Sequence, residues 1–158
     1  MKPLPFRSVP AATHRWRTDG LACPTVTADA ARAVGVAGPG RLTESTDLSA
    51  AGNTITCLWA PAGRAESVTL SLDTSTSQAA ADIAWQTRSA LLREAVPGVG
   101  EQAFTGVLGN EIQVLVRSGN ATLNVTVVAK PDDPEGLSSL RAAAPAIAGA
   151  MLGSLIPA

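Results

Sequence analysis

The sequence predicts an α/β protein of the α+β type, in which helices flank a central antiparallel sheet of about five or six strands. Three observations predict this fold class. Several segments alternate apolar and polar residues, short turns join neighbouring segments of this kind, and two longer segments carry one apolar stripe at helical spacing. Strands joined by short turns pair antiparallel, and an amphipathic helix buries its stripe by covering a face of the sheet.

The length of 158 residues suits a single domain. We expect this domain to span residues 21–158 and to follow a disordered basic tail over residues 1–20. The tail contains prolines and an excess of positive charge, which disfavour a packed core. Its charged residues are Lys2, Arg7, Arg15, Arg17 and Asp19.

A short helix opens the domain in CPTVTADAARAVG, where Thr27 can cap the first turn and Gly35 can end the helix. A loop follows, with an irregular strand around residues 42–47. Two strands then run through NTITCLWAP and ESVTLSLDT, whose alternation separates core residues from solvent-facing ones. The residues expected in the core are Ile55, Cys57, Trp59, Val68, Leu70 and Leu72.

In residues 77–96 the apolar period changes from two to about 3.6, which predicts a helix that ends at Pro97 and Gly98. Its expected cap is Ser75, Thr76 or Ser77. Its expected apolar stripe consists of Ala80, Ile83, Ala84, Thr87 and Leu91, with Trp85 as a further member.

Three more strands are expected at residues 101–105, 110–118 and 121–130, and Ser118-Gly119-Asn120 indicates a hairpin between the last two. The final helix follows, with Asp133 as its cap. The apolar stripe of this helix consists of Leu137, Leu140, Ala144, Ile147, Met151 and Leu155.

Pro134 suits the first position of the final helix, whereas Pro145 is expected to kink the helix or to split it in two. Residues 142–158 carry no charge. Their Ala and Gly content and their prolines nevertheless favour a helix docked on the sheet over a membrane span.

The stretch VPGVGEQAF spaces Gly98, Gly100 and Ala103 as in a dinucleotide-binding loop. That loop works at the start of a helix, whose main-chain amides hold the pyrophosphate. Here the glycines follow a helix and precede a strand, and Glu101 adds a negative charge. We therefore interpret the stretch as a turn and expect no nucleotide cofactor.

Cys23 and Cys57 are the two cysteines of the chain. With no histidine near them and no second cysteine pair, they cannot complete a four-ligand zinc site. They can close a disulfide between the first helix and a core strand, which would indicate an oxidising compartment. The alternative is a pair of buried, reduced thiols in a cytosolic protein.

Catalytic and metal-binding groups are scarce. The single histidine, His14, lies in the expected tail, where it would be a mobile base. The cluster Asp132, Asp133 and Glu135 is explained by capping of the last helix. Aromatic residues make up 3% of the chain, which disfavours binding of nucleic acid by base stacking. We therefore expect no enzyme activity, no metal or other cofactor and no nucleic-acid partner.

In the order and spacing of these motifs, residues 20–156 resemble the actinobacterial family of secreted proteins and lipoproteins known as domain of unknown function 3558. The resemblance rests on the cysteine in CPTVTADAARAVG, the cysteine in TCLW, the Ala-rich helix and VPGVGEQAF. It implies export, usually with a lipid anchor, and a disulfide between Cys23 and Cys57. It also implies an α/β/α sandwich similar to the PsbP-like fold of LpqN-type envelope lipoproteins. The family brings no agreed activity.

MKPLPFRSVPAATHRWRTDG lacks the apolar run of an export signal, so we expect that a signal or lipid anchor has been removed. The expected location is extracytoplasmic, either secreted or anchored at the outer face of the membrane. A removed anchor or the basic tail would then give a peripheral contact with the membrane.

These observations favour a non-catalytic binding module of the cell envelope. It would contact an envelope protein, a lipid or a wall component through the exposed sheet face or the edge of a helix. The alternative is a carrier of lipids or small molecules, with an apolar pocket between the C-terminal helix and the sheet. The residues expected to bind a ligand or partner are Trp59, Trp85, Met151 and Leu155, although both tryptophans also suit the core.

Overall fold

The structure is a computed structural model. It describes Trp16, Cys23 and residues 40–47, 52–60, 67–75, 77–90, 92, 94–153 and 155, with the main chain alone for residues 46 and 47. Apart from Cys23, the expected helix in CPTVTADAARAVG lies outside the described residues. Apart from Trp16, so does the tail expected over residues 1–20, whose disorder stays a prediction.

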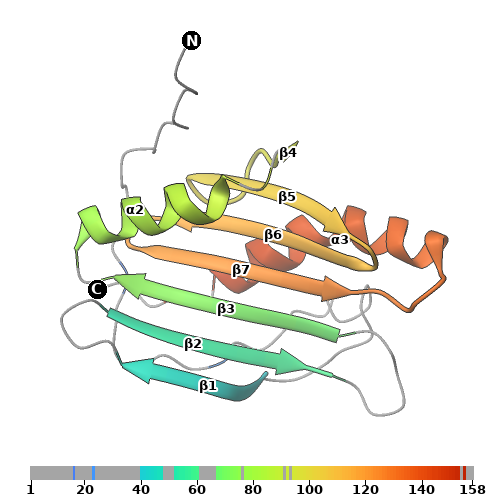
Figure 1. The fold of residues 1–158 in the computed structure, drawn as a ribbon, viewed down its shortest axis with the longest axis horizontal. Helices are drawn as coiled ribbons and strands as arrows, with labels where there is room; N and C mark the ends of the chain where they lie inside the picture. Colours follow the sequence, from blue (N-terminus) through green and yellow to red (C-terminus); the bar gives the residue numbers. More distant parts are fainter. Residues whose placement is uncertain are drawn as a thin grey trace, which may run out of the picture.

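Seven strands form one antiparallel sheet in the order β1-β2-β3-β7-β6-β5-β4 (Figure 1). The strands are β1 (Arg41–Asp47), β2 (Gly52–Trp59), β3 (Ser67–Ser75), β4 (Glu94–Ala95), β5 (Gln102–Leu108), β6 (Glu111–Ser118) and β7 (Ala121–Val128). The described helices are α2 (Gln78–Ser89) and α3 (Pro134–Leu152). The predicted α+β class is confirmed. The strand count exceeds the predicted five or six because a two-residue strand, β4, extends the sheet beyond β5.

The hairpin predicted between β6 and β7 is confirmed. Ser118 pairs with Ala121, which leaves Gly119 and Asn120 as a two-residue turn. Gly119 has a φ of 53°, a conformation that glycine adopts at little cost. Because β3 pairs with β7, the turn lies beside the end of β3, where Ser75 donates its main-chain N–H to the Asn120 carbonyl at 2.9 Å.

The main core lies on the sheet face that α3 covers, behind the strands in Figure 1. The alternation predicted for β2 and β3 is confirmed, because the six residues expected in the core are all buried. Strands β6 and β7 add a second set of buried residues, and four apolar residues of α3 cover the core on the side away from the sheet. These two sets are Ile112, Val114, Val116, Leu123, Val125 and Val127 from the strands, and Leu140, Ala144, Ile147 and Met151 from the helix.

Helix α3 begins where the sequence predicts. The Asp133 side chain accepts a hydrogen bond from the Gly136 N–H at 3.0 Å, and Pro134 occupies the first turn. Pro145 lies inside one continuous helix, so it does not split the helix in two.

The predicted disulfide is present in the structure. Cys23 is bonded to Cys57, with 5.7 Å between their Cα atoms. Cys57 is fully buried in β2 within the main core. The bond therefore ties the segment that precedes the sheet to the centre of the domain.

The predicted stripe of α2 is wrong except for Trp85, and the predicted cap at Ser77 is confirmed. Helix α2 buries Ala81, Trp85 and Ser89, whereas Ile83 is 66% exposed. The large indole of Trp85 has more apolar surface to bury than Ile83, and it sets which side of the helix meets the sheet. The helix also ends at residue 89, and the residues expected to extend it contain strand β4 instead.

Candidate functional site

An ion pair between a buried arginine and a partly exposed aspartate fixes the first half of α2 on the sheet. Arg117 of β6 is fully buried, and its guanidinium donates to the Ala81 carbonyl at 3.0 Å and to the Asp82 carboxylate. Gln78 donates to the same carboxylate at 2.7 Å. Burial alone would raise the pKa of Asp82, but hydrogen bonds from Arg117 and Gln78 and the charge of Arg117 hold this pKa below its ordinary value.

A second ion pair fixes the other end of α2. Arg88 pairs with Asp73 of β3, whose carboxylate also accepts a hydrogen bond from the Thr54 hydroxyl at 2.7 Å. Partial burial lowers the pKa of the Arg88 guanidinium. The two pairs hold α2 across one end of the sheet and leave the rest of this face uncovered by the described helices.

The uncovered part, which we call the open face, consists of Thr56, Leu58, Thr69, Ser71, Gln113, Asn124 and Thr126. These residues come from β2, β3, β7 and β6 and stand in cross-strand rows, because Thr69 is opposite both Leu58 and Thr126 and Ser71 is opposite Asn124. All seven are half-buried. Six of the seven are polar, and none is charged.

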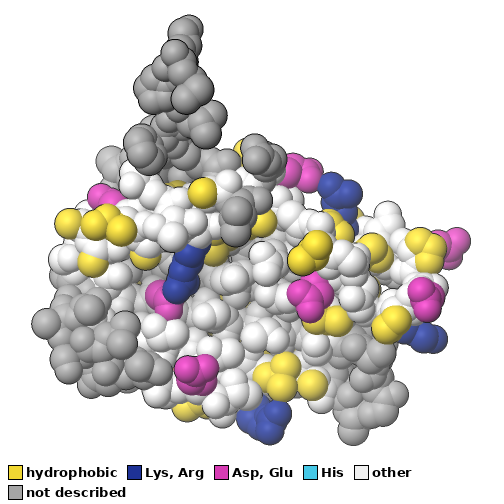
Figure 2. Space-filling view, viewed as in Figure 1, with side chains coloured by type: hydrophobic (Ala, Val, Ile, Leu, Met, Phe, Trp, Pro, Cys, Tyr) yellow, Lys and Arg dark blue, Asp and Glu magenta, His cyan; other side chains and the backbone are white. Residues whose placement is uncertain are grey.

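Figure 2 shows the open face below α2 as a surface of mostly uncharged polar side chains and main chain. Charged side chains are spaced around it rather than gathered on it. The centre of the open face is therefore an uncharged surface that is rich in hydrogen-bonding groups. Its edges are charged, because Arg41 and Glu44 of β1 lie opposite Leu58 and Thr56, and Glu111 of β6 lies opposite Val128.

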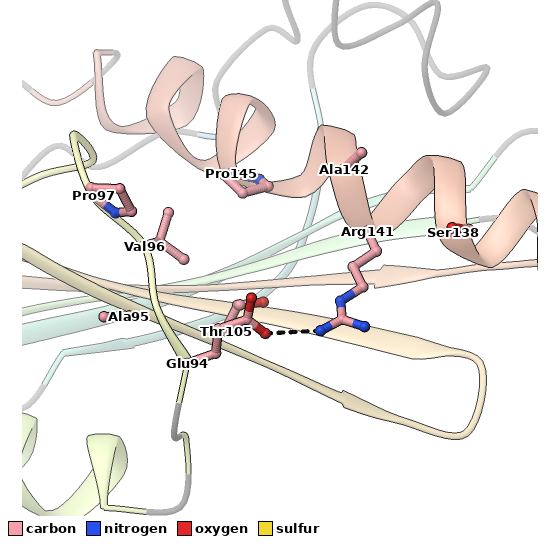
Figure 3. A pocket seen from close by; sticks show the side chains of 9 residues that line it. All are labelled: Glu94, Ala95, Val96, Pro97, Thr105, Ser138, Arg141, Ala142 and Pro145. Atoms are coloured by element: carbon pink, nitrogen blue, oxygen red, sulfur yellow. Dashed lines mark hydrogen bonds and ion pairs between the residues drawn. The ribbon is translucent and has the colours of Figure 1, made fainter.

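A groove of about 380 Å³ lies between β4 and α3 (Figure 3). Its lining includes Val96 and Pro145, and Arg141 of α3 donates to the Glu94 carboxylate of β4 at 2.8 Å. Both charged side chains are more than half exposed, at 54% and 59%, so water screens their attraction. The two charges face one another, and the pair links the short edge strand to the helix.

The structure separates the residues that were expected to bind a ligand or partner. Trp59 and Met151 are buried in the main core, and Leu155 packs against it. Trp85 is buried on the other face of the sheet, where its indole donates to Gln102 at 2.8 Å. Because the sheet lies between Trp85 and Met151, these residues do not line one pocket.

Trp16, which sequence reasoning left in the tail, is docked on the β6–β7 turn. Its main-chain N–H donates to the Asn120 side-chain oxygen at 2.7 Å, and its carbonyl accepts from the Asn120 amide at 3.0 Å. Its indole N–H donates to the Ser118 hydroxyl at 3.0 Å. A large aromatic residue in an otherwise polar segment is the one local signal that could have marked it.

The stretch VPGVGEQAF contains a turn, as predicted, but the turn follows strand β4 rather than a helix and leads into β5. Gly98 and Gly100 have φ values of 79° and 59° and open no helix. Glu101 accepts a hydrogen bond from the Gly119 N–H at 2.5 Å. The carboxylate thus joins this turn to the β6–β7 turn.

Within the part of the chain that the structure describes, no group of three His, Cys, Asp or Glu residues is placed to hold a metal ion. His14 lies outside that part. Neither described helix combines the length and the apolar character that crossing a bilayer requires.

Comparisons of the chain with protein-family models, with curated proteins and with solved structures find no significant match.

Proposed function

We propose that the protein is a non-catalytic binding module that works outside the cytoplasm and contacts a protein of the cell envelope through the open face. The observation that carries this proposal is the uncharged polar centre of the sheet face that the two ion pairs of α2 leave uncovered. Uncharged hydroxyl and amide groups cost less to desolvate than charges, provided that the partner supplies hydrogen bonds. Short Thr and Ser side chains also lose little rotamer freedom when a partner orders them.

The disulfide supports the extracytoplasmic location, since such bonds persist in oxidising compartments. The resemblance to exported actinobacterial lipoproteins points the same way. The disulfide and the resemblance support the location alone. The polar composition of the open face supports its role as the binding surface.

A protein suits the open face better than a lipid surface does. Membrane contact relies on clustered basic residues or on an inserted apolar face, whereas this surface is neutral and mostly polar. A partner protein can match the rows of Thr, Ser, Asn and Gln with its own main-chain and amide groups.

The test places a charge on the open face. We would fix wild type and Thr69→Lys on beads, pass solubilised envelope proteins over them, and quantify what each retains. Because an unpaired lysine must be desolvated in the interface, we expect at least tenfold less of a specific partner on Thr69→Lys, which corresponds to about 1.4 kcal/mol.

The matched control is Ser139→Lys on an exposed part of α3, which should retain the partner as wild type does. Equal retention by all three proteins would contradict the proposal. So would binding to anionic vesicles or to insoluble cell wall that Thr69→Lys abolishes, because the partner would then be a lipid or a wall polymer.

A further inference from the structure

We propose that the β6–β7 turn and the end of α3 form a recognition site for an extended peptide segment that carries a tryptophan. Trp16 is the resident ligand of this site, and the tryptophan of a second segment can displace it. The site lies apart from the open face and does not depend on the function proposed above.

Asn120 recognises the main chain of the ligand. Its side-chain amide donates to the carbonyl of Trp16 and accepts from the N–H of the same residue, as a neighbouring strand would. The amide is held in place, because it also donates to the Ser75 carbonyl at 2.9 Å and the residue is 2% exposed. Because both hydrogen bonds are made to main-chain groups, Asn120 can bind an extended segment regardless of the side chain at that position.

Ser118 and the hollow beside it recognise the side chain. The Ser118 hydroxyl is buried and accepts from the indole N–H, a bond that phenylalanine cannot make. A hollow of about 360 Å³ adjoins Trp16 and is also lined by Glu101, Gly149 and Leu152. A Cβ added at Gly149 would meet no atom within 4 Å, which shows that this part of the helix leaves open space. The hydrogen bond to Ser118 therefore favours tryptophan over phenylalanine.

Trp16 can leave the site without breaking a covalent link between its segment and the sheet. The chain is covalently fixed to the sheet at Cys23, seven residues after Trp16, and stays fixed there when Trp16 leaves. A short tether gives Trp16 an effective concentration on the order of millimolar. A partner segment must compete with Trp16 at that effective concentration, and its binding would release Trp16 from Asn120 and Ser118.

The experiment uses the full chain with Trp16→Ala and a fluorescein-labelled peptide AATHRWRTDGL, which matches residues 11–21. Fluorescence anisotropy measures peptide binding. We expect the peptide to bind Trp16→Ala at least tenfold more tightly than wild type, because wild type fills the site with its own segment. A peptide with alanine in place of tryptophan should bind at least tenfold more weakly.

Adding Ser118→Ala to the Trp16→Ala chain should weaken binding about fivefold, through loss of one hydrogen bond. The open-face change Thr69→Lys should leave peptide binding unchanged, which separates a failure of this site from a failure of the proposed function. The inference is overturned if the peptide does not bind, if it binds wild type and Trp16→Ala equally, or if the alanine peptide binds as well.

A second measurement needs no variant. In wild type, the indole N–H of Trp16 should exchange with solvent at least tenfold more slowly than that of a peptide tryptophan, because it is bonded to Ser118. An excess of the unlabelled peptide should remove this protection. The inference would be overturned if the Trp16 indole N–H of wild type, without added peptide, exchanged as fast as that of a peptide tryptophan.

Discussion

Asp82→Ala tests whether the buried Arg117 holds α2 on the sheet. The variant removes the carboxylate and leaves a fully buried guanidinium that still donates to the Ala81 carbonyl. Breaking a buried ion pair costs about 3–5 kcal/mol when both partners are shielded from water. Asp82 keeps 38% of its side chain exposed, so we expect the lower end, about 3 kcal/mol of unfolding free energy.

Two further variants separate the ion pair from the helix itself. Arg117→Met removes the buried charge and keeps a long apolar side chain, and should cost about 1 kcal/mol. Gln86→Ala changes an exposed position of α2 and should stay within about 0.5 kcal/mol of wild type. Urea unfolding at neutral pH, with the disulfide intact, measures all three. The reasoning is refuted if Asp82→Ala costs no more than Gln86→Ala.

The same pair predicts a pH dependence. The folded-state pKa of Asp82 lies below its ordinary value of 3.8, so the ionised carboxylate stabilises the folded protein. That contribution is complete above the ordinary value and is lost as the pH falls through the folded-state pKa. Asp82→Ala should therefore cost less at pH 3 than at pH 7. A cost that is equal or larger at pH 3 would contradict this account.

Three further predictions concern stability. Removing the disulfide, which closes a loop between residues 34 apart, should lower the unfolding free energy by about 4 kcal/mol, measured in urea with and without replacement of both cysteines by alanine. Gly52→Ala should be far more destabilising than Gly98→Ala in thermal unfolding, because a Cβ at residue 52 meets the Thr74 carbonyl, whereas one at residue 98 meets nothing and costs about 1–2 kcal/mol for its positive φ alone. Glu94→Ala should change the unfolding free energy by less than about 1 kcal/mol, since its ion pair with Arg141 is exposed, and a larger loss in urea would show that the pair holds β4 in place.

The alternation of β2 and β3 was predictable because each of these strands presents one face to the main core and one to a polar surface. Residues such as Cys57 and Thr56 then differ in kind, and the pattern can be read locally. In β6 the same alternation fails. It predicts that Leu115 and Arg117 point to solvent, on the side opposite Ile112, Val114 and Val116, but both are buried beneath α2. Burial on this side depends on where a helix from elsewhere in the chain docks, and the apolar–polar alternation within β6 does not indicate that position.

The polar character of the open face was visible in the sequence, since Thr69 and Ser71 alternate with core residues. Its extent was not, because the ion pairs of α2 decide how much of the sheet stays uncovered. The docking of Trp16 was also beyond local reasoning, because Asn120 lies 104 residues away. The candidate ligand residues Trp59, Trp85 and Met151 belong to the core, which agrees with the general tendency of large apolar side chains to be buried.

The central claim is that the open face contacts a protein of the cell envelope. Its most direct test is photo-crosslinking in cells that export the protein, with a photoreactive amino acid at position 69 and, in a second chain, at position 139. We predict a covalent adduct with one protein from position 69 and none from position 139. An adduct from position 139 alone, or adducts from position 69 that contain lipid or wall polymer and no protein, would contradict the claim.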